Sequence, residues 1–161
     1  GSESCIVVLG ATAPAAKPGE PVAAYELTGP WTVSFAPAGA GTVFGPKQKL
    51  DALVDLTAER FAGACGTFRY RTTLEFDEPV EHAVLDLSDV YEVATAAVDG
   101  DPLGTRITPP YAWSLGTLNA GKHELVIDVV NTLDHAVSDI FALTESIAPS
   151  GILGPVRIIA R

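Results

Sequence analysis

From Thr67 to Phe76, mostly apolar side chains alternate with polar ones, and this pattern constrains the fold of the 161-residue chain more than any other feature. One set of positions holds Phe68, Tyr70, Thr72, Leu74 and Phe76, and the other holds Arg69, Arg71, Thr73 and Glu75. Side chains of a strand point alternately to its two faces, whereas a helix repeats about every 3.6 residues. The segment is therefore predicted to be a strand with one face in a core and the other in solvent.

Shorter apolar runs separated by glycine and proline recur along the rest of the chain. We expect further strands at Tyr25–Leu27, Trp31–Phe35, His82–Leu87, Glu92–Val98, Tyr111–Leu115, Glu124–Val130 and Val156–Ala160. Asp99-Gly100 predicts a hairpin turn, because Gly100 adopts a positive φ at little cost. The one candidate helix lies within Leu50–Phe61, with one or two turns around Thr57–Arg60. Roughly eight or nine strands at these intervals predict an all-β fold, a jelly-roll β-sandwich of two antiparallel sheets.

The length suits one domain. Residues 1–24 are expected to form an N-terminal strand at Cys5–Leu9 and a linker, and residues 25–161 the β-sandwich module. The spacing of Cys5 and Cys65 leaves open one disulfide or two thiols, and two buried or half-buried thiols are favoured. The chain starts with Gly1-Ser2 and contains no methionine, so we expect a processed segment or one excised from a longer gene.

The net charge of −10 bears on the partners of the chain. An acidic surface repels phosphate groups, so we expect neither a nucleic acid nor an anionic membrane surface as a partner. No apolar run approaches the roughly 20 residues that span a bilayer. Neutral sugars are compatible with this charge, since aromatic stacking and hydrogen bonds recognise them.

Several motifs occur in a fixed order along the chain. They are Phe61-Ala-Gly63 before Gly66–Leu74, then Leu85–Val93, Val98–Gly104, Pro109–Tyr111, Leu118–Leu125, Val129–Asn131 and Ser150–Val156. In this order they resemble the galactose-binding-like β-sandwich modules of glycoside hydrolases, in family 2 enzymes and in α-L-rhamnosidase-type enzymes. Most of these residues are turn glycines, prolines and strand ends, so the resemblance is more specific for fold than for function.

The resemblance implies a non-catalytic, carbohydrate-binding accessory module of a glycoside hydrolase. The alternative is a structural domain that braces the catalytic domain without binding sugar. The implied partners are an oligosaccharide or polysaccharide and the catalytic domain of the parent enzyme, and the implied location is outside the cell or in its envelope. We expect no catalytic residue and no cofactor, because no nucleophile, zinc or phosphate-loop motif occurs.

Sugar binding needs an exposed aromatic ring beside polar groups that read hydroxyls. The candidate residues, mostly in loops, are Tyr91, Arg106, Trp113, Asn131, Asp134 and His135. Trp113 shares a strand face with Tyr111 and Leu115, and Trp31 shares one with Val33 and Phe35, which favours a core position for both tryptophans. A structural calcium ion is one further hypothesis, with Asp99, Asp101 and Asp139 as candidate ligands.

Overall fold

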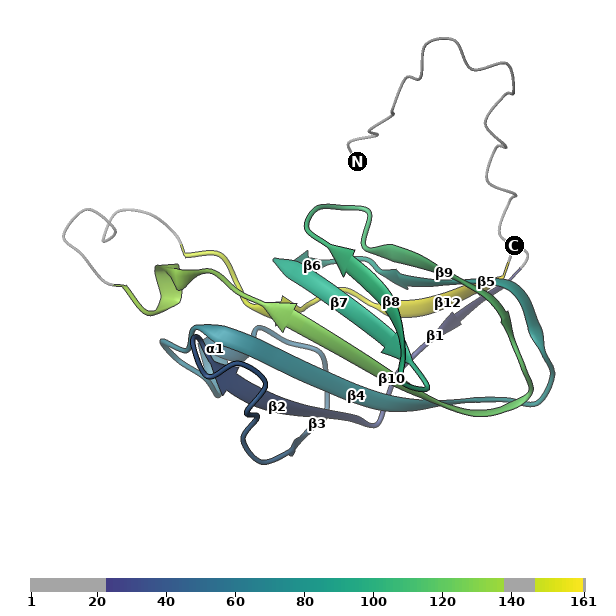
Figure 1. Ribbon diagram of the computed structural model, residues 1–161, viewed down its shortest axis with the longest axis horizontal. Helices are drawn as coiled ribbons and strands as arrows, with labels where there is room; N and C mark the ends of the chain where they lie inside the picture. Colours follow the sequence, from purple (N-terminus) through teal and green to yellow (C-terminus); the bar gives the residue numbers. More distant parts are fainter. Residues whose placement is uncertain (1–22, 138–146, 161) are drawn as a thin grey trace, which may run out of the picture.

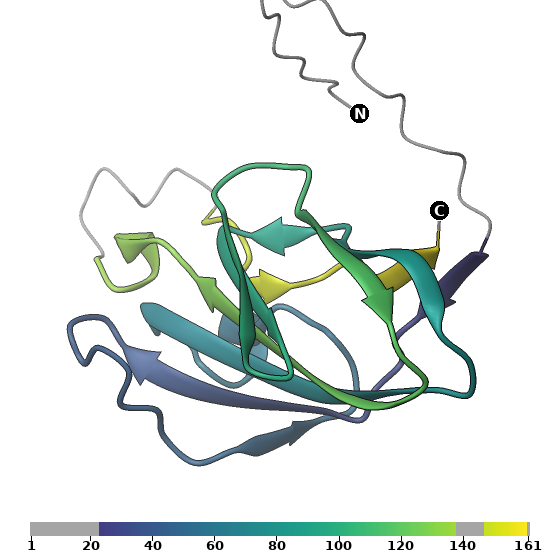
Figure 2. The same cartoon turned by 45° about the vertical axis from the view of Figure 1, so that its right-hand side comes forward.

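Two antiparallel sheets lie face to face in the computed structural model, which describes residues 23–137 and 147–160 (Figure 1). The smaller sheet has the strand order β1 (Ala23–Glu26), β12 (Val156–Ala160), β5 (Val80–Leu87) and β9 (Ala112–Leu118). The larger sheet has the order β3 (Gln48–Leu50), β2 (Trp31–Pro37), β4 (Gly66–Phe76), β10 (Gly121–Val130), β7 (Val93–Val98) and β8 (Asp101–Arg106). Figure 2 shows the layer that contains β12 above the layer that contains β2 and β4. The predicted all-β sandwich is confirmed.

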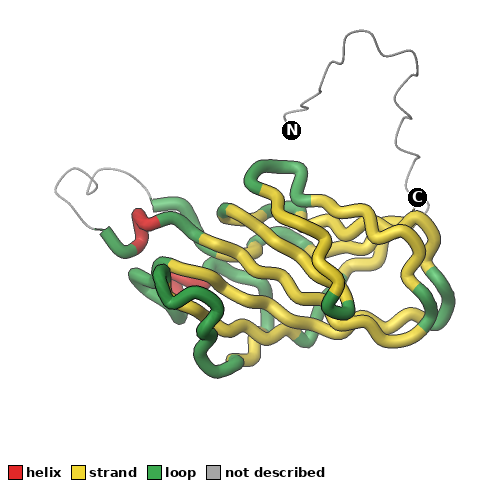
Figure 3. Tube along the Cα trace, in the orientation of Figure 1, coloured by secondary structure: helices red, strands yellow, loops and turns green. Residues whose placement is uncertain are grey.

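The remaining elements are short (Figure 3). Strands β6 (Val90–Tyr91) and β11 (Gly151–Ile152) pair as a two-stranded ribbon, and a 3₁₀ turn, η1, spans Leu133–His135. The predicted helix is a single turn, α1 (Leu56–Glu59). Its N-cap is Asp55, whose carboxylate accepts the backbone N–H of Thr57 at 3.0 Å, as N-terminal caps commonly do.

Strand β4 lies at the centre of the larger sheet, between β2 and β10. Its burial alternates as the sequence predicts, with Phe68, Tyr70 and Leu74 in the core. The smaller sheet covers this face with Leu85, Leu87, Trp113, Val156 and Ile158, all of them buried. Burial of this apolar area, at roughly 25 cal/mol per Å², is the main force that holds the two layers together.

Strand β3 has no counterpart in the sequence prediction, and β8 is implied there only by the hairpin turn at Asp99-Gly100. Strand β3 has three residues, two of them polar and exposed, so it is too short for an alternation to be recognised. Strand β8 contains Pro102 and Gly104, which normally argue against a strand. It lies at the edge of its sheet, where a proline costs few ladder hydrogen bonds, and its pairing with β7 is irregular beside these two residues.

The first described strand belongs to the sandwich. Strand β1 pairs with β12 from Ala23↔Ala160 onward, so residues 23–24 are part of the smaller sheet. Cys65 is half-buried, whereas Cys5 and the expected strand Cys5–Leu9 lie outside the described residues, so the state of the two cysteines stays a prediction. Within residues 23–137 and 147–160, no helix has the length and apolar character needed to cross a membrane.

Candidate functional site

The two ends of the sandwich differ in how they are built. One end is here called the loop end. Strands β2, β8 and β10 end there, at Pro37, Arg106 and Val130, and the loops that follow them begin side by side. At the other, the hairpin end, short turns join β4 to β5 and β9 to β10 (Figure 1). The residues that the sequence predicts for sugar binding lie at the loop end.

Asn131 is one of these predicted residues, and it is 7% exposed. Its side-chain oxygen accepts the backbone N–H of Gly66 at 2.9 Å. Its side-chain nitrogen donates to the carbonyl of Ala64 at 2.9 Å and to the hydroxyl of Ser150 at 3.0 Å. These bonds join three loops of the loop end, so the amide contributes to the fold.

His135 continues the same network. Its Nε2 lies 2.8 Å from the hydroxyl oxygen of Ser150. A serine beside a histidine is typical of an activated nucleophile, but Ser150 is 0% exposed and no substrate can reach it. Ser150 also donates its backbone N–H to the carboxylate of Asp55 at 3.0 Å. The pair His135–Ser150 therefore links the 3₁₀ turn η1 to the segment before β11 at the loop end.

Asp55 has a carboxyl pKa below its ordinary value. Burial disfavours the charged form, but hydrogen bonds from the side chain of Thr57 and from the backbone of Ser150 and Thr57 outweigh that effect. Asp55 and Ser150 were not among the residues predicted from the sequence. The one local signal is Asp55 followed two residues later by Thr57, which is typical of a helix cap.

The indole of Trp113 is 2% exposed, so its ring offers no platform for a sugar. Its Nε1 donates to the carbonyl of Gly104 at 3.0 Å, and the guanidinium of Arg106 lies 5.4 Å from the ring centroid. The burial of Trp113 argues against a role in sugar binding, and its core position is confirmed, as it is for Trp31. Arg106 itself donates to the carbonyl of Ala112 at 3.1 Å.

Of the remaining predicted residues, Tyr91 is half-buried on β6 and Asp134 is exposed in η1. The loop-end set therefore contains no fully exposed aromatic ring among its described members. Sugar binding by this set stays a prediction. The hydrogen bonds of Asn131 and His135 within the fold argue against it.

Of the three proposed calcium ligands, the structure describes Asp99 and Asp101. Asp99 accepts the backbone N–H of Glu124 at 2.7 Å with one oxygen, and its other oxygen lies 2.6 Å from Nδ1 of His123. Asp101 is exposed at the start of β8, and Asp139 lies outside the described residues. Over residues 23–137 and 147–160, no three His, Cys, Asp or Glu side chains come together in a way that could hold a metal ion.

His123 and Asp99 form an ion pair instead. Nε2 of His123 lies 2.9 Å from the carbonyl oxygen of Asn119, which can only accept, so that nitrogen carries a proton. The Asn119 carbonyl and the Asp99 carboxylate both favour the doubly protonated ring and raise the pKa of His123. The same contact, together with the N–H of Glu124, lowers the pKa of Asp99.

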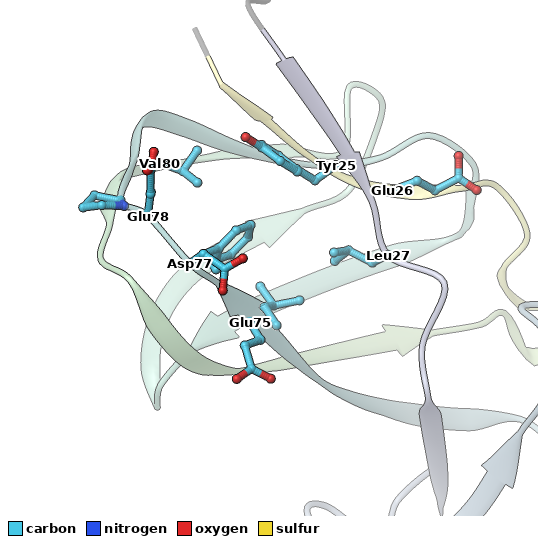
Figure 4. Close-up of a pocket in the computed structure, with 10 residues that line it drawn as sticks. Tyr25, Glu26, Leu27, Glu75, Asp77, Glu78 and Val80 are labelled. Atoms are coloured by element: carbon cyan, nitrogen blue, oxygen red, sulfur yellow. The ribbon is translucent and has the colours of Figure 1, made fainter.

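A cleft with a volume of about 590 Å³ lies at the hairpin end. We call it the Tyr25 cleft, and its lining consists of Tyr25, Glu26, Leu27, Leu74, Glu75, Phe76, Asp77, Glu78, Pro79 and Val80. Figure 4 shows β1 with Tyr25 and Glu26 on one side and the end of β4 with Glu75 and Asp77 on the other. The cleft therefore opens between the edge of the smaller sheet and the β4–β5 turn.

An aromatic pair forms one wall of the Tyr25 cleft. The Tyr25 ring meets the Phe76 ring edge to face, with centroids 5.7 Å apart and planes at 80°. Tyr25 remains 45% exposed, while Leu74 and Val80 are buried beneath it. An exposed ring above an apolar floor is the arrangement expected of a sugar site, and neither buried tryptophan provides it.

The charged side chains that line this cleft are all acidic, with four carboxylates and no Lys, Arg or His. Glu75 lies 3.8 Å from Nζ of Lys122, and Glu26 lies 4.0 Å from Nε of Arg157. Asp77 and Glu78 have no ion pair within the described part of the chain. Ionised carboxylates only accept hydrogen bonds, so the cleft suits a ligand rich in donors and repels anions.

No protein-family model and no curated protein sequence matches this chain. Solved structures that share its fold include three glycoside hydrolases. A rhamnosidase from Novosphingobium sp. PP1Y is 25% identical, with a TM-score of 0.72 over 92% of this chain. A GH2 beta-galacturonidase from Eisenbergiella tayi, bound to galacturonate, is 19% identical, with a TM-score of 0.63 over 86%. A Ruminococcus gnavus beta-glucuronidase in complex with uronic isofagomine is 15% identical, with a TM-score of 0.64 over 89%.

All three matched chains are several times longer than this one. The chain spans 16% of the rhamnosidase, 24% of the beta-galacturonidase and 29% of the beta-glucuronidase. The fold described above is therefore that of a β-sandwich region within larger glycoside hydrolase chains.

Proposed function

We propose that this chain is a non-catalytic β-sandwich module of a glycoside hydrolase and that it binds a neutral saccharide in the Tyr25 cleft. The likeness to parts of three glycoside hydrolases supports the association with such an enzyme. The observation that carries sugar binding is the 45% exposed ring of Tyr25 on a cleft lined by carboxylates. The parent enzyme is proposed to act outside the cell or in its envelope.

The chemistry of the cleft matches a sugar. The C–H face of a pyranose packs against an aromatic ring, which contributes about 0.5–1.5 kcal/mol beyond area burial in aromatic contacts. Asp77 and Glu78 are then placed to accept hydrogen bonds from sugar hydroxyls, and bonds to charged acceptors are stronger than neutral ones. A uronic acid would meet four carboxylates, so the ligand of this cleft is proposed to be uncharged.

Titration calorimetry of the chain with a panel of neutral oligosaccharides tests this proposal. Tyr25→Ala is expected to weaken binding by about tenfold, whereas Tyr25→Phe keeps the ring and remains within about threefold. Tyr91→Ala is the matched control, because it removes a tyrosine at the loop end and leaves the cleft intact. The proposal fails if the wild-type chain binds none of the sugars, or if Tyr25→Ala binds them as the wild type does.

A second function, bracing of the catalytic domain, is favoured by the apolar surface of the loop end. Large apolar side chains are exposed on the segments at this end: Val43, Ile107, Val130, Leu133, Val137 and Ile147. Exposed apolar groups gathered on one face of a soluble domain commonly mark a contact with another domain. The proposed occupant is the remainder of the same glycoside hydrolase chain, of which this module spans a minor part.

Calorimetry of the intact enzyme separates the two functions. Leu133→Ser with Ile107→Ser is expected to uncouple the melting of the module from that of the rest of the enzyme, with sugar affinity unchanged. Tyr25→Ala is expected to weaken sugar binding and to leave the melting profile of the intact enzyme unchanged. A melting profile that the double variant leaves unchanged would argue against the brace.

A further inference from the structure

Positive charge is concentrated on one part of this acidic chain. Eight lysine and arginine residues are described, and five of them lie on or beside β3, β2 and β4: Lys47, Lys49, Arg60, Arg69 and Arg71. A groove of about 480 Å³ runs across this region on the larger sheet. We call it the basic groove, and it is lined by Pro30, Trp31, Thr32, Lys47, Lys49, Arg71, Thr72, Thr73 and Glu124.

Strand pairing builds the groove from residues that are distant in sequence. Thr32 pairs with Lys49 on β3 and with Arg71 on β4, so these three residues form one row across three strands. Because β4 alternates, Thr73 lies on the same face as Arg71. Arg60 donates to the backbone carbonyl of Lys49 at 2.7 Å, which ties the short edge strand β3 to the segment after α1.

The cations of the groove are incompletely neutralised. Arg69, just outside it, is fully paired, with two bonds of 2.7 Å to the carboxylate of Asp128. Within the groove, Nε of Arg71 lies 3.6 Å from Glu124, and Nζ of Lys49 lies 3.6 Å from Asp51. Lys47 has no ion pair within residues 23–137 and 147–160. The lining thus holds three cations and one carboxylate, the opposite balance to the Tyr25 cleft.

We propose that the basic groove is a second saccharide site, one that binds an anionic glycan through its carboxylate or sulfate group. Arg71 supplies a planar fork of donors that matches such an oxyanion, and Lys47 and Lys49 add charge around it. Thr32 and Thr73 line the groove together with Arg71, and their hydroxyls can contact sugar hydroxyls there. The volume is in the range of small-molecule sites, roughly 300–1,000 Å³, which favours one or two sugar rings over a protein partner.

The site goes beyond the proposed function, because it is separate from the Tyr25 cleft and selects ligands of opposite charge.

The test is calorimetry with three probes: tri-galacturonate, its fully methyl-esterified form and a sulfated trisaccharide. Tri-galacturonate is expected to bind at least about tenfold more tightly than its methyl ester, since the ester removes the charge and little else. The affinity is expected to fall as salt rises from 20 to 300 mM, roughly the range over which screening becomes strong. The sulfated probe shows whether carboxylate or sulfate is the preferred group.

Variants locate the site. Arg71→Ala is expected to weaken tri-galacturonate binding by about tenfold, and Lys47→Ser, at an exposed loop position where folding is not at risk, by about threefold. Arg157→Ala is the matched control, because it removes one positive charge from the smaller sheet. Tyr25→Ala is expected to leave this binding unchanged, so failure here is distinguishable from failure of the neutral-sugar site. Equal binding of acid and ester, an equal loss in Arg157→Ala, or equally tight binding of a tri-glutamate peptide would overturn the proposal.

Discussion

Replacement of Asn131 by alanine is the sharpest test of how the loop end is held together. The side chain makes three hydrogen bonds, to the N–H of Gly66, the carbonyl of Ala64 and the hydroxyl of Ser150. Each such bond contributes about 1 kcal/mol net, and a buried partner left unsatisfied costs about 1–3 kcal/mol. Asn131→Ala is therefore expected to lower the free energy of unfolding by about 3 kcal/mol. At about 2–4 °C per kcal/mol for a chain of this size, Tm falls by roughly 6–12 °C.

Thermal and urea unfolding followed by circular dichroism measure this change. Asn119→Ala is the matched control, because that asparagine has an exposed side chain at the hairpin end and should shift Tm by less than about 2 °C. Asn131→Ala is expected to bind neutral sugars as the wild type does once both are folded. A stable variant that has lost sugar binding would refute the structural assignment and restore Asn131 to a ligand site.

Two further predictions concern titrating side chains. Because the pKa of His123 is raised above 6.5, the stability that its pair with Asp99 contributes is complete below that pH and is lost as pH rises through the folded pKa. Asp99→Asn removes the charge of Asp99 but keeps an acceptor for the N–H of Glu124. Urea unfolding of this variant should show a larger loss of stability at pH 6 than at pH 9. An equal loss at both pH values would contradict the ion pair. Tyr70→Phe removes the buried hydroxyl that accepts the N–H of Ile152 at 3.2 Å; it should cost about 1–3 kcal/mol and speed hydrogen exchange at Ile152, and unchanged exchange would count against it.

Local patterns were sufficient for the strands of the core. The alternation of β4 and the hairpin turn at Asp99-Gly100 depend only on neighbouring residues, and the structure reproduces both. The turn has positive φ values at both positions, 53° at Asp99 and 86° at Gly100, as a type I′ hairpin requires. The edge strand β3 was missed because pairing with β2, and not its own sequence, makes it a strand.

The candidate sites could not be assigned in the same way, because they depend on distant contacts. By residue type and sequence position, Asn131 looks like an exposed loop residue. Its role in the fold depends on its hydrogen bonds to Ala64 and Gly66, which lie more than 60 positions away. Tyr25 meets Phe76 across about fifty positions, and no local pattern distinguishes it from a core tyrosine. The sequence shows which residues are polar or aromatic, whereas the strand register decides which of them face solvent.

The net charge of −10 does not by itself decide which ligands the protein binds. Exclusion of anionic partners assumes that the charge is spread evenly, but the Tyr25 cleft holds four carboxylates and the basic groove holds three cations. Fields at a surface decay over about 10 Å at 0.1 M salt, so a ligand of one or two sugar rings responds to the nearest side chains. A nucleic acid extends much farther than that and would meet the acidic remainder of the surface as well. The overall charge therefore argues against long polyanions, while each cleft is free to select a short saccharide of its own charge.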